Sequence, residues 1–246
     1  MQRSLAISTA VAFLAASAIV SARADERAVV VELFTSQGCS SCPAADRLLG
    51  QIAQDPGIVA MSLPVDYWDY LGWKDTLANP RHTARQRGYA RSRGDRDVYT
   101  PQAVINGTLH TLGSDKPAIE AAIRATQADP STPAVAVKLT VSRGEIDVTV
   151  PTIPRPVPEA EVWLCELAKA VPVEIGRGEN GGHTIVYHNV VRRWVRLGTW
   201  DGAEHSFQFP TEKLAHDGID AVAVLVQKGS IEHPGPILGA ASQSLH

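Results

Sequence analysis

Two cysteines separated by two residues, Cys39 and Cys42, are the residues in this sequence best suited to chemistry. They follow an apolar run at 29–34, typical of a strand buried on both faces, and precede apolar residues that predict a helix to about Gln54. Unpaired N–H groups and the helix dipole favour a thiolate at a helix N-terminus, where cysteine pKa values fall from about 8.5 to about 3.5–7.5. The spacing also lets the two sulfurs close a small disulfide. The pair therefore predicts redox chemistry.

The position of each cysteine predicts its role. Cys39, at the extreme end of the helix, is expected to be the exposed nucleophile that attacks a substrate disulfide. Cys42, one turn in and more buried, is expected to resolve the mixed disulfide. The alternative is a local structural disulfide, although a bridge across so short a loop removes little entropy from the unfolded chain.

Metal binding is an alternative of a different class. Cys39 and Cys42 could hold a soft ion such as Cu(I), which thiolates select. However, the sequence lacks a second Cys-x-x-Cys and any compact His–Cys arrangement. His183 and His188 are five residues apart and would face opposite sides of a strand. We predict no metal site and no cofactor.

Further signals place other elements around the cysteine pair. Asp55-Pro56-Gly57 predicts a turn, and 58–63 a second strand. Residues 66–75 are loop-like and hold four aromatic side chains. These form either a satellite core under the loop or an exposed surface that grips an extended peptide.

A helix is expected from Pro80, with the proline in its first turn. Six arginines accompany it, and we interpret them as a solvated helix face. Arginines turned toward the cysteines would instead favour the thiolate further. The six are Arg81, Arg85, Arg87, Arg91, Arg93 and Arg96.

A hairpin is predicted by Asn106-Gly107, which lies between two short β-prone runs. Pro101 stands just before the first of these runs, where only special backbone arrangements tolerate proline. Ser114-Asp115 can cap a helix that follows. The predicted order is therefore strand, helix, strand, helix, strand, strand, helix.

This order, with Cys-x-x-Cys opening the first helix and Thr-Pro before the third strand, resembles the thioredoxin fold. More narrowly, 35–43 (Thr-Ser-Gln-Gly-Cys-Ser-Ser-Cys-Pro) and 99–102 (Tyr-Thr-Pro-Gln) are similar to motifs of an exported bacterial thioredoxin-like family, catalogued as a domain of unknown function. Blocks 65–73 and 180–191 are similar to it too. The resemblance implies a thioredoxin-like first domain and membership of this family.

The resemblance also implies roles for Thr100, Pro101 and Glu32. The equivalent proline of thioredoxin-like proteins is cis, so we expect a cis Thr100–Pro101 bond that brings the Thr100 backbone beside the sulfurs, where it can pair with a substrate strand. Glu32 lies in an apolar strand, where a carboxylate is expensive to bury. Thioredoxins carry a buried acid in this strand that relays the proton of the resolving cysteine, although the spacing to the cysteines is one residue longer here. Alternatively, Glu32 points toward a polar edge or an arginine.

The second half of the chain has a different sequence pattern, which predicts strands and no helices. Residues 129–133 (Asp-Pro-Ser-Thr-Pro) predict a boundary between an α/β thioredoxin-like domain at 25–129 and an antiparallel β-sandwich at 134–246. Cys165 is expected to be a buried apolar residue. No chemistry is assigned to this half, and a non-catalytic, partner-binding role stays open. Its strand candidates are 135–141, 145–150, 161–167, 184–189, 194–197, 206–209 and 221–227.

Residues 1–24 have the pattern of a removed export signal. Arg3 precedes an apolar stretch, and Ala22-Arg23-Ala24 is a cleavage pattern. No later run approaches the ~18 apolar residues of a membrane-spanning helix. A formal net charge of −3 gives no indication of nucleic-acid binding. The mature chain is therefore expected in the periplasm or secreted, where its partner is a protein thiol or disulfide.

Overall fold

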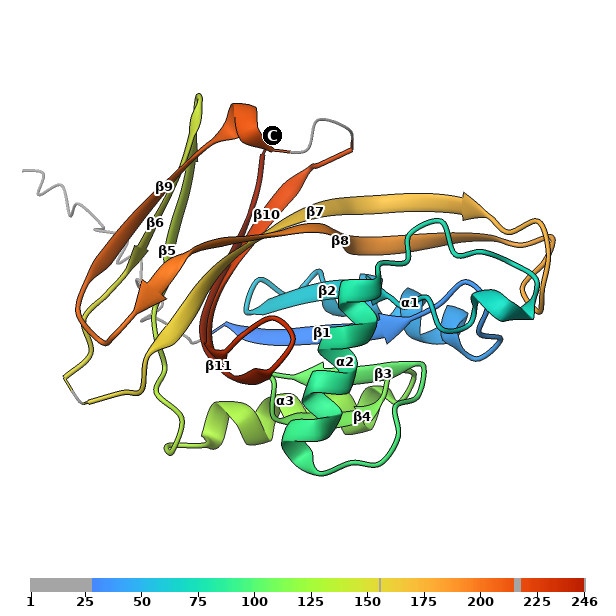
Figure 1. Cartoon of the computed structure of the whole chain (residues 1–246), viewed down its shortest axis with the longest axis horizontal. Coiled ribbons are helices and arrows are strands. Elements are labelled where there is room, and N and C mark those ends of the chain that lie inside the picture. The colour runs from blue at the N-terminus through green and yellow to red at the C-terminus, as the bar shows by residue number, and fades with distance from the viewer. Residues whose placement is uncertain (1–27, 155, 215–217, 246) are drawn as a thin grey trace, which may run out of the picture.

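The computed structural model describes residues 28–154, 156–214 and 218–245, so the predicted export signal lies outside the described residues. Within them the chain is a mixed α/β protein, and its first half has the order of elements predicted from the sequence (Figure 1). That half comprises β1 (Val29–Thr35), α1 (Cys42–Ile52), β2 (Ile58–Pro64), α2 (Pro80–Arg93), β3 (Gln102–Ile105), β4 (Leu109–Leu112) and α3 (Lys116–Ala128). The second half comprises β5 (Lys138–Ser142), β6 (Glu145–Val150), β7 (Ala160–Glu174), β8 (Thr184–Trp200), β9 (His205–Pro210), β10 (Ala221–Gly229) and β11 (Pro234–Ser244).

One eight-stranded sheet runs through both halves, in the order β11-β10-β7-β8-β2-β1-β3-β4. β1 pairs in parallel with β2 and antiparallel with β3, and β8 joins them through a parallel pair of Ser62 with Val190. The sequence predicts a sandwich confined to the second half, whereas four strands of that half continue the sheet of the first. The remaining three form a second sheet, β5-β6-β9.

β1 is buried on both faces, as its apolar sequence predicts. Val31 and Leu33 pack with side chains of α1 and α3. Val30 and Phe34, on the other face, pack with α2 and with strands of the second half. Because side chains alternate along a strand, Glu32 lies on this second face, away from α1.

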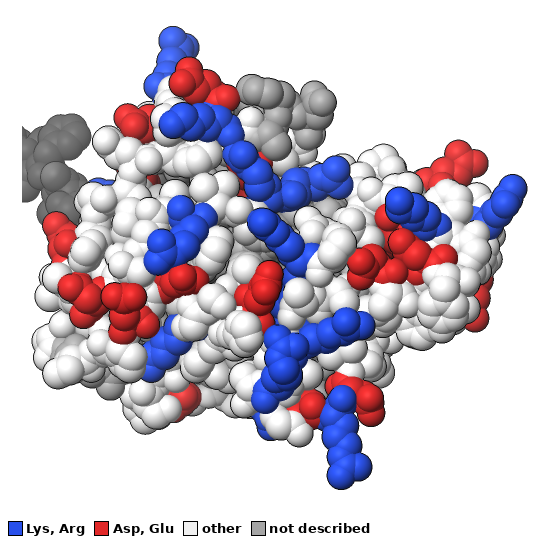
Figure 2. Space-filling model, in the orientation of Figure 1, with Lys and Arg blue, Asp and Glu red and all other residues white. Residues whose placement is uncertain are grey.

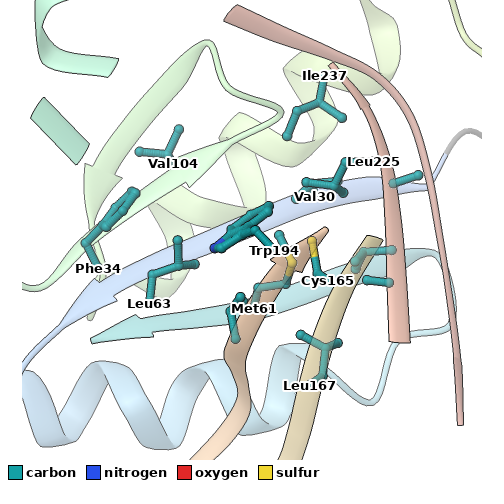
Figure 3. Packing of buried hydrophobic residues seen from close by; sticks show 14 of the residues in the cluster. Val30, Phe34, Met61, Leu63, Val104, Cys165, Leu167, Trp194, Leu225 and Ile237 are labelled. Carbon is teal, nitrogen blue, oxygen red and sulfur yellow. The ribbon is translucent and has the colours of Figure 1, made fainter. Parts of the chain in front are cut away.

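The two halves share a hydrophobic core (Figure 3). Cys165 of β7 is fully buried in this core and is a free thiol, which confirms the predicted environment. The burial raises the pKa of this thiol well above its ordinary value. Residues of the first half in this core include Val30, Phe34, Met61, Leu63 and Val104, and those of the second half include Leu167, Trp194, Leu225 and Ile237.

A long β7–β8 hairpin replaces several of the short strands predicted for the second half. β7 has 15 residues and β8 has 17, and they pair along nearly their whole length. Asn189, with φ +49°, interrupts the alternation within β8, so the sequence pattern there reads as two strands. The prediction of separate strands at 184–189 and 194–197 is therefore wrong. The hairpin extends past α1, and its tip lies near the start of that helix (Figure 1).

The three-stranded sheet packs on the part of the large sheet farthest from α1 (Figure 1). Val148 of β6 and Phe209 of β9 belong to one cluster with Leu164 and Val224 of the large sheet. β11, at the edge of the large sheet, has no counterpart among the predicted strands because its prolines and glycines hide the alternation, and an edge strand tolerates them. In the described part of the chain, every helix is too short or too polar to cross a membrane.

Candidate redox site

Cys39 and Cys42 form a disulfide in the connection between β1 and α1. α1 begins at Cys42, with Ser41 as its N-cap and Pro43 in the first turn. Cys39 therefore lies in the turn three residues before the first residue of the helix. The prediction that it occupies the end of the helix itself is wrong. Its side chain is only 5% exposed and that of Cys42 is fully buried. Cys39 is thus the more accessible sulfur, but much less exposed than the sequence suggests.

The segment after β2 holds the loop that leads into Cys39. The backbone N–H of Gln37 donates to the Asp75 carboxylate at 2.8 Å, and the Trp73 indole N–H donates to the Gln37 side-chain oxygen at 2.7 Å. Asp75 also accepts from the N–H of Leu77 at 2.8 Å. Burial raises the pKa of Asp75, and these backbone hydrogen bonds partly offset the effect. The aromatic segment therefore supports the cysteine loop directly.

The tip of the β7–β8 hairpin holds the same loop from the other side. The Asn180 amide donates to the carbonyl oxygens of Gln37 and Cys39, each at 2.9 Å. The Ser40 backbone N–H donates to a carboxylate oxygen of Glu179 at 3.2 Å. The sequence indicates only a tight turn or loop at 179–182, and no local signal connects it to residues about 140 positions earlier. The second half of the chain thus contributes to the site.

The Thr100–Pro101 bond is cis, as the resemblance implies. The pairing of Phe34 with Gln102 places Pro101 beside the end of β1. Trp68 connects this turn to the cysteine loop, because its indole N–H donates to the Thr100 hydroxyl at 2.7 Å and a Cβ on Gly38 would lie 3.2 Å from the Trp68 Cβ. The cis-proline turn and the loop that carries Cys39 therefore share Trp68 as a common neighbour.

Glu32 lies on the face of β1 opposite to α1, the helix that begins at Cys42. Its carboxylate accepts hydrogen bonds from Arg85 at 2.6 and 3.1 Å and from the Tyr89 hydroxyl at 2.5 Å, all fully buried. The alternative in which Glu32 meets an arginine is the one that the structure shows. Arg85 is consequently buried, not solvated as predicted, whereas Arg81, Arg87, Arg91 and Arg96 are exposed.

A different acid, Asp46, lies on the cysteine side of the sheet. It follows Cys42 by four residues on α1, so the two side chains share one helix face, and both are buried. Neither the Asp46 oxygens nor the Thr35 hydroxyl make a regular hydrogen bond with a described residue. Burial raises the pKa of Asp46 to about 8, with a smaller contribution from nearby Asp75, and the Thr35 hydroxyl offsets part of the increase. No sequence motif marks Asp46, whose only signal is that it is a carboxylate one turn after Cys42.

Strand β8 packs against α1 near the buried Asp46. α1 packs so tightly on β8 that a Cβ on Gly50 would lie 2.5 Å from the His188 ring. The buried Tyr187 hydroxyl has no hydrogen-bond partner among the described residues, and its pKa is raised by burial and then by the nearby Asp46 carboxylate. Asp46 is thus enclosed in a site that offers its charge little compensation.

Side chains that could bind a metal do not cluster around the disulfide among the described residues. In the described ranges, no three side chains of His, Cys, Asp or Glu are grouped closely enough to hold a metal ion. Soft-metal binding by this site would therefore depend on Cys39 and Cys42 alone.

The fold and site define a mixed α/β protein with a disulfide at the N-terminus of its first helix, beside a cis-proline turn. Residues 30–227 match the family described as "Protein of unknown function (DUF1223)", and the chain belongs to this family. It is similar to the crystal structure of protein AGR_C_4864 from Agrobacterium tumefaciens, with 32% sequence identity and a TM-score of 0.79 over 89% of this chain and 95% of that one.

Two weaker likenesses concern the fold and a short segment. The structure of HBP35 of Porphyromonas gingivalis matches with a TM-score of 0.54 and 15% identity, over 89% of this chain and 76% of that chain, which shows a likeness of fold alone. A "Probable Thioredoxin" of Archaeoglobus fulgidus is 40% identical over 38 residues, which are 15% of this chain. The match spans 42% of that protein's length.

Proposed function

We propose that this protein is a thiol–disulfide oxidoreductase that exchanges thiols and disulfides with an extracytoplasmic protein partner. The observation that carries the proposal is the Cys39–Cys42 disulfide at the start of α1, beside the cis Thr100–Pro101 bond. The short match to a probable thioredoxin supports it. In this proposal 1–24 is the export signal and 25–129 the thioredoxin-like unit, whose sheet is extended by strands of 134–246.

Two displacement steps make up the reaction. In the reduced protein the Cys39 thiolate attacks one sulfur of the partner disulfide, and the other partner sulfur leaves as a thiolate that takes up a proton. Cys42 then loses its proton, attacks the Cys39 sulfur and releases the second partner sulfur. The partner gains two electrons and two protons, and the protein regains its disulfide. The reverse steps oxidise a partner dithiol.

The exposure of the two cysteines supports their roles in these steps. Cys39 has the only exposed surface of the pair and is the nucleophile, while the fully buried Cys42 resolves the mixed disulfide from within the protein. The partner chain pairs with the backbone of Thr100 while it is bonded to Cys39, as an added strand. Trp68 fixes that turn by its hydrogen bond to the Thr100 hydroxyl.

Asp46, and not Glu32, is the acceptor for the Cys42 proton in this proposal. It lies one turn from Cys42 on the same helix face and keeps its oxygens free of regular hydrogen bonds with described residues. A pKa of about 8 is close to that of an ordinary thiol, which suits a group that receives and returns this proton near neutral pH. Glu32 is held by Arg85 on the other face of β1.

Cysteine variants and a redox titration test the proposal. Cys39→Ser is expected to abolish exchange with a test disulfide, and Cys42→Ser to trap a mixed disulfide that mass spectrometry detects. The parent pair is expected to equilibrate in glutathione buffers at a potential between about −120 and −270 mV, as catalytic exchangers do. A potential below about −300 mV, or an unchanged rate in Cys39→Ser, would instead identify a structural bridge.

A further inference from the structure

An open groove with a volume of about 550 Å³ lies beside the redox site. One wall is aromatic and the other is basic. Tyr70 is 77% exposed and stacks on Trp68, with 6.3 Å between ring centroids and 21° between ring planes. The aromatic wall consists of Tyr67, Trp68 and Tyr70, and the basic wall includes Arg87, Arg91 and Arg96.

The groove is continuous with the site through Trp68. The Cβ and backbone oxygen of Trp68 lie against Gly38, the residue before Cys39. Its indole N–H donates a hydrogen bond to the Thr100 hydroxyl, and Trp68 also lines the groove. A polypeptide joined to Cys39 therefore has the groove directly beside its cysteine. An exposed aromatic surface supplies contact area to such a chain at a low entropic cost.

The groove is lined by three arginines and two aspartates, so positive charge is in excess. Asp95 also lines it but is paired with Arg93 at 2.8 Å, which leaves Asp97 as the other acid. Arg91 donates to the backbone carbonyl of Glu232, an uncharged partner, and so keeps its charge. Among the described residues, neither Arg87 nor Arg96 has an ion-pair partner. Figure 2 shows Lys and Arg side chains gathered over α2, which carries Arg87 and Arg91.

We propose that this groove binds an acidic segment of the partner polypeptide, adjacent to the cysteine that is exchanged. The inference rests on the proposed function and names the class of substrate for it. Carboxylates of the segment meet the guanidinium groups of Arg87, Arg91 and Arg96, and its apolar side chains cover Trp68 and Tyr70. Because these arginines are exposed, the attraction acts mainly on the rate of encounter and weakens with salt.

Three disulfide peptides that differ only in charge test the inference. Each contains one cysteine flanked by Glu, Gln or Lys residues and joined to a small fluorescent thiol, and the rate of its reduction by the reduced full-length protein is measured. The Glu peptide is expected to react about tenfold faster than the Lys peptide at low ionic strength, and the difference to disappear in 0.5 M salt. Arg87→Gln/Arg96→Gln is expected to lose the preference. The matched control Arg124→Gln/Arg143→Gln removes two exposed charges elsewhere and is expected to keep it.

An uncharged substrate separates this inference from the proposed function. The parent protein is also assayed with hydroxyethyl disulfide, which is too small and neutral to use the groove. Turnover of this compound with equal rates for the Glu and Lys peptides would overturn the acidic-segment proposal while leaving exchange intact. A preference that persists in Arg87→Gln/Arg96→Gln would also overturn it. Lack of turnover with every disulfide would overturn the proposed function, and this inference with it.

Discussion

The side-chain amide of Asn180 donates a hydrogen bond of 2.9 Å to the backbone carbonyl of Cys39, from a position 141 residues later in the chain. Asn180 is almost fully buried and makes a second, equally short hydrogen bond to the carbonyl of Gln37. The tip of the β7–β8 hairpin therefore fixes the backbone on both sides of Gly38. The loop that carries the accessible sulfur is held by the second half of the protein as well as by the first.

Replacement of Asn180 is expected to loosen this loop. Asn180→Ala removes the donors to two carbonyls, at a cost of about 1–3 kcal/mol for groups left unsatisfied in a buried place. We expect the unfolding free energy to fall by this amount and dithiothreitol to reduce the disulfide several-fold faster. The control Asn189→Gly removes a similar amide–carbonyl hydrogen bond, from Asn189 to Ala60, and tolerates the positive φ of that position. A reduction rate that rises equally in both variants would contradict a specific role for Asn180.

The negative charge of Glu179 is expected to disfavour the thiolate form of Cys39 in the reduced protein. The Glu179 carboxylate accepts from the backbone N–H of Ser40, the residue that follows Cys39, so it places a negative charge on the cysteine loop. Glu179→Gln removes this negative charge, so the thiolate of the reduced protein should form more readily, and the effect should be small because Glu179 is exposed and screened. The reduction potential should rise, because a more stable thiolate favours the reduced pair.

Thiolate absorbance in a pH titration measures the first effect and equilibration with glutathione the second. The control is Glu174→Gln, which removes an exposed carboxylate from the same hairpin. A Glu179→Gln titration that overlays both parent and control would show that this charge does not act on Cys39.

Asp46 is expected to make the unfolding free energy of the oxidised protein decrease as pH rises. Because its pKa is raised from 3.8 to about 8, mainly by burial, the folded chain retains a proton that the unfolded chain loses. The stability it contributes is complete below about pH 4 and is lost as pH rises toward 8. At about 1.4 kcal/mol per pKa unit, the loss is at most about 6 kcal/mol.

Urea unfolding between pH 4 and pH 9 measures this slope in the parent and in Asp46→Asn. Burial lowers the pKa of His82 to about 4, so His82 adds stability as pH rises from 4 to about 6.5. This contribution is present in both proteins, and the difference between their unfolding free energies therefore isolates Asp46. Asp55→Asn, at an exposed turn, is the control. Parallel curves for parent and Asp46→Asn would mean that Asp46 is already charged in the folded protein.

The parts of the site that could be predicted from the sequence are those whose signals are local. Cys39, Cys42 and Pro101 are placed by short motifs next to predicted strands and helices, and Asp115 caps α3 as its neighbours indicate. The turn at Asn106, with φ +45°, also follows from its own dipeptide. Each of these depends on a few consecutive residues, so one sequence is enough.

The contributions that were missed depend on pairing across long distances. Asn180 and Glu179 reach the site only because β7 and β8 extend past α1, and the length of these strands is set by their pairing with each other. Arg85 is one of several arginines on α2, and its burial follows from a carboxylate 53 residues earlier. Asp46 becomes unusual only when β8 covers it. The hydrophobic periodicity of a single segment does not indicate which distant residues will contact it.

The buried cluster around Glu32 is expected to serve stability and not proton transfer. Glu32→Gln leaves the fully buried Arg85 without its charged partner, so the unfolding free energy should fall by about 3–5 kcal/mol. Glu32→Met/Arg85→Met removes both charges and should recover much of this loss, because a buried ion pair can often be replaced by apolar side chains of similar volume. Stopped-flow measurements of the attack and resolution steps, made where the variants are still folded, should show the rates of the parent. Resolution that slows in Glu32→Gln while attack is unchanged would return the relay to Glu32, and Asp46 would lose it.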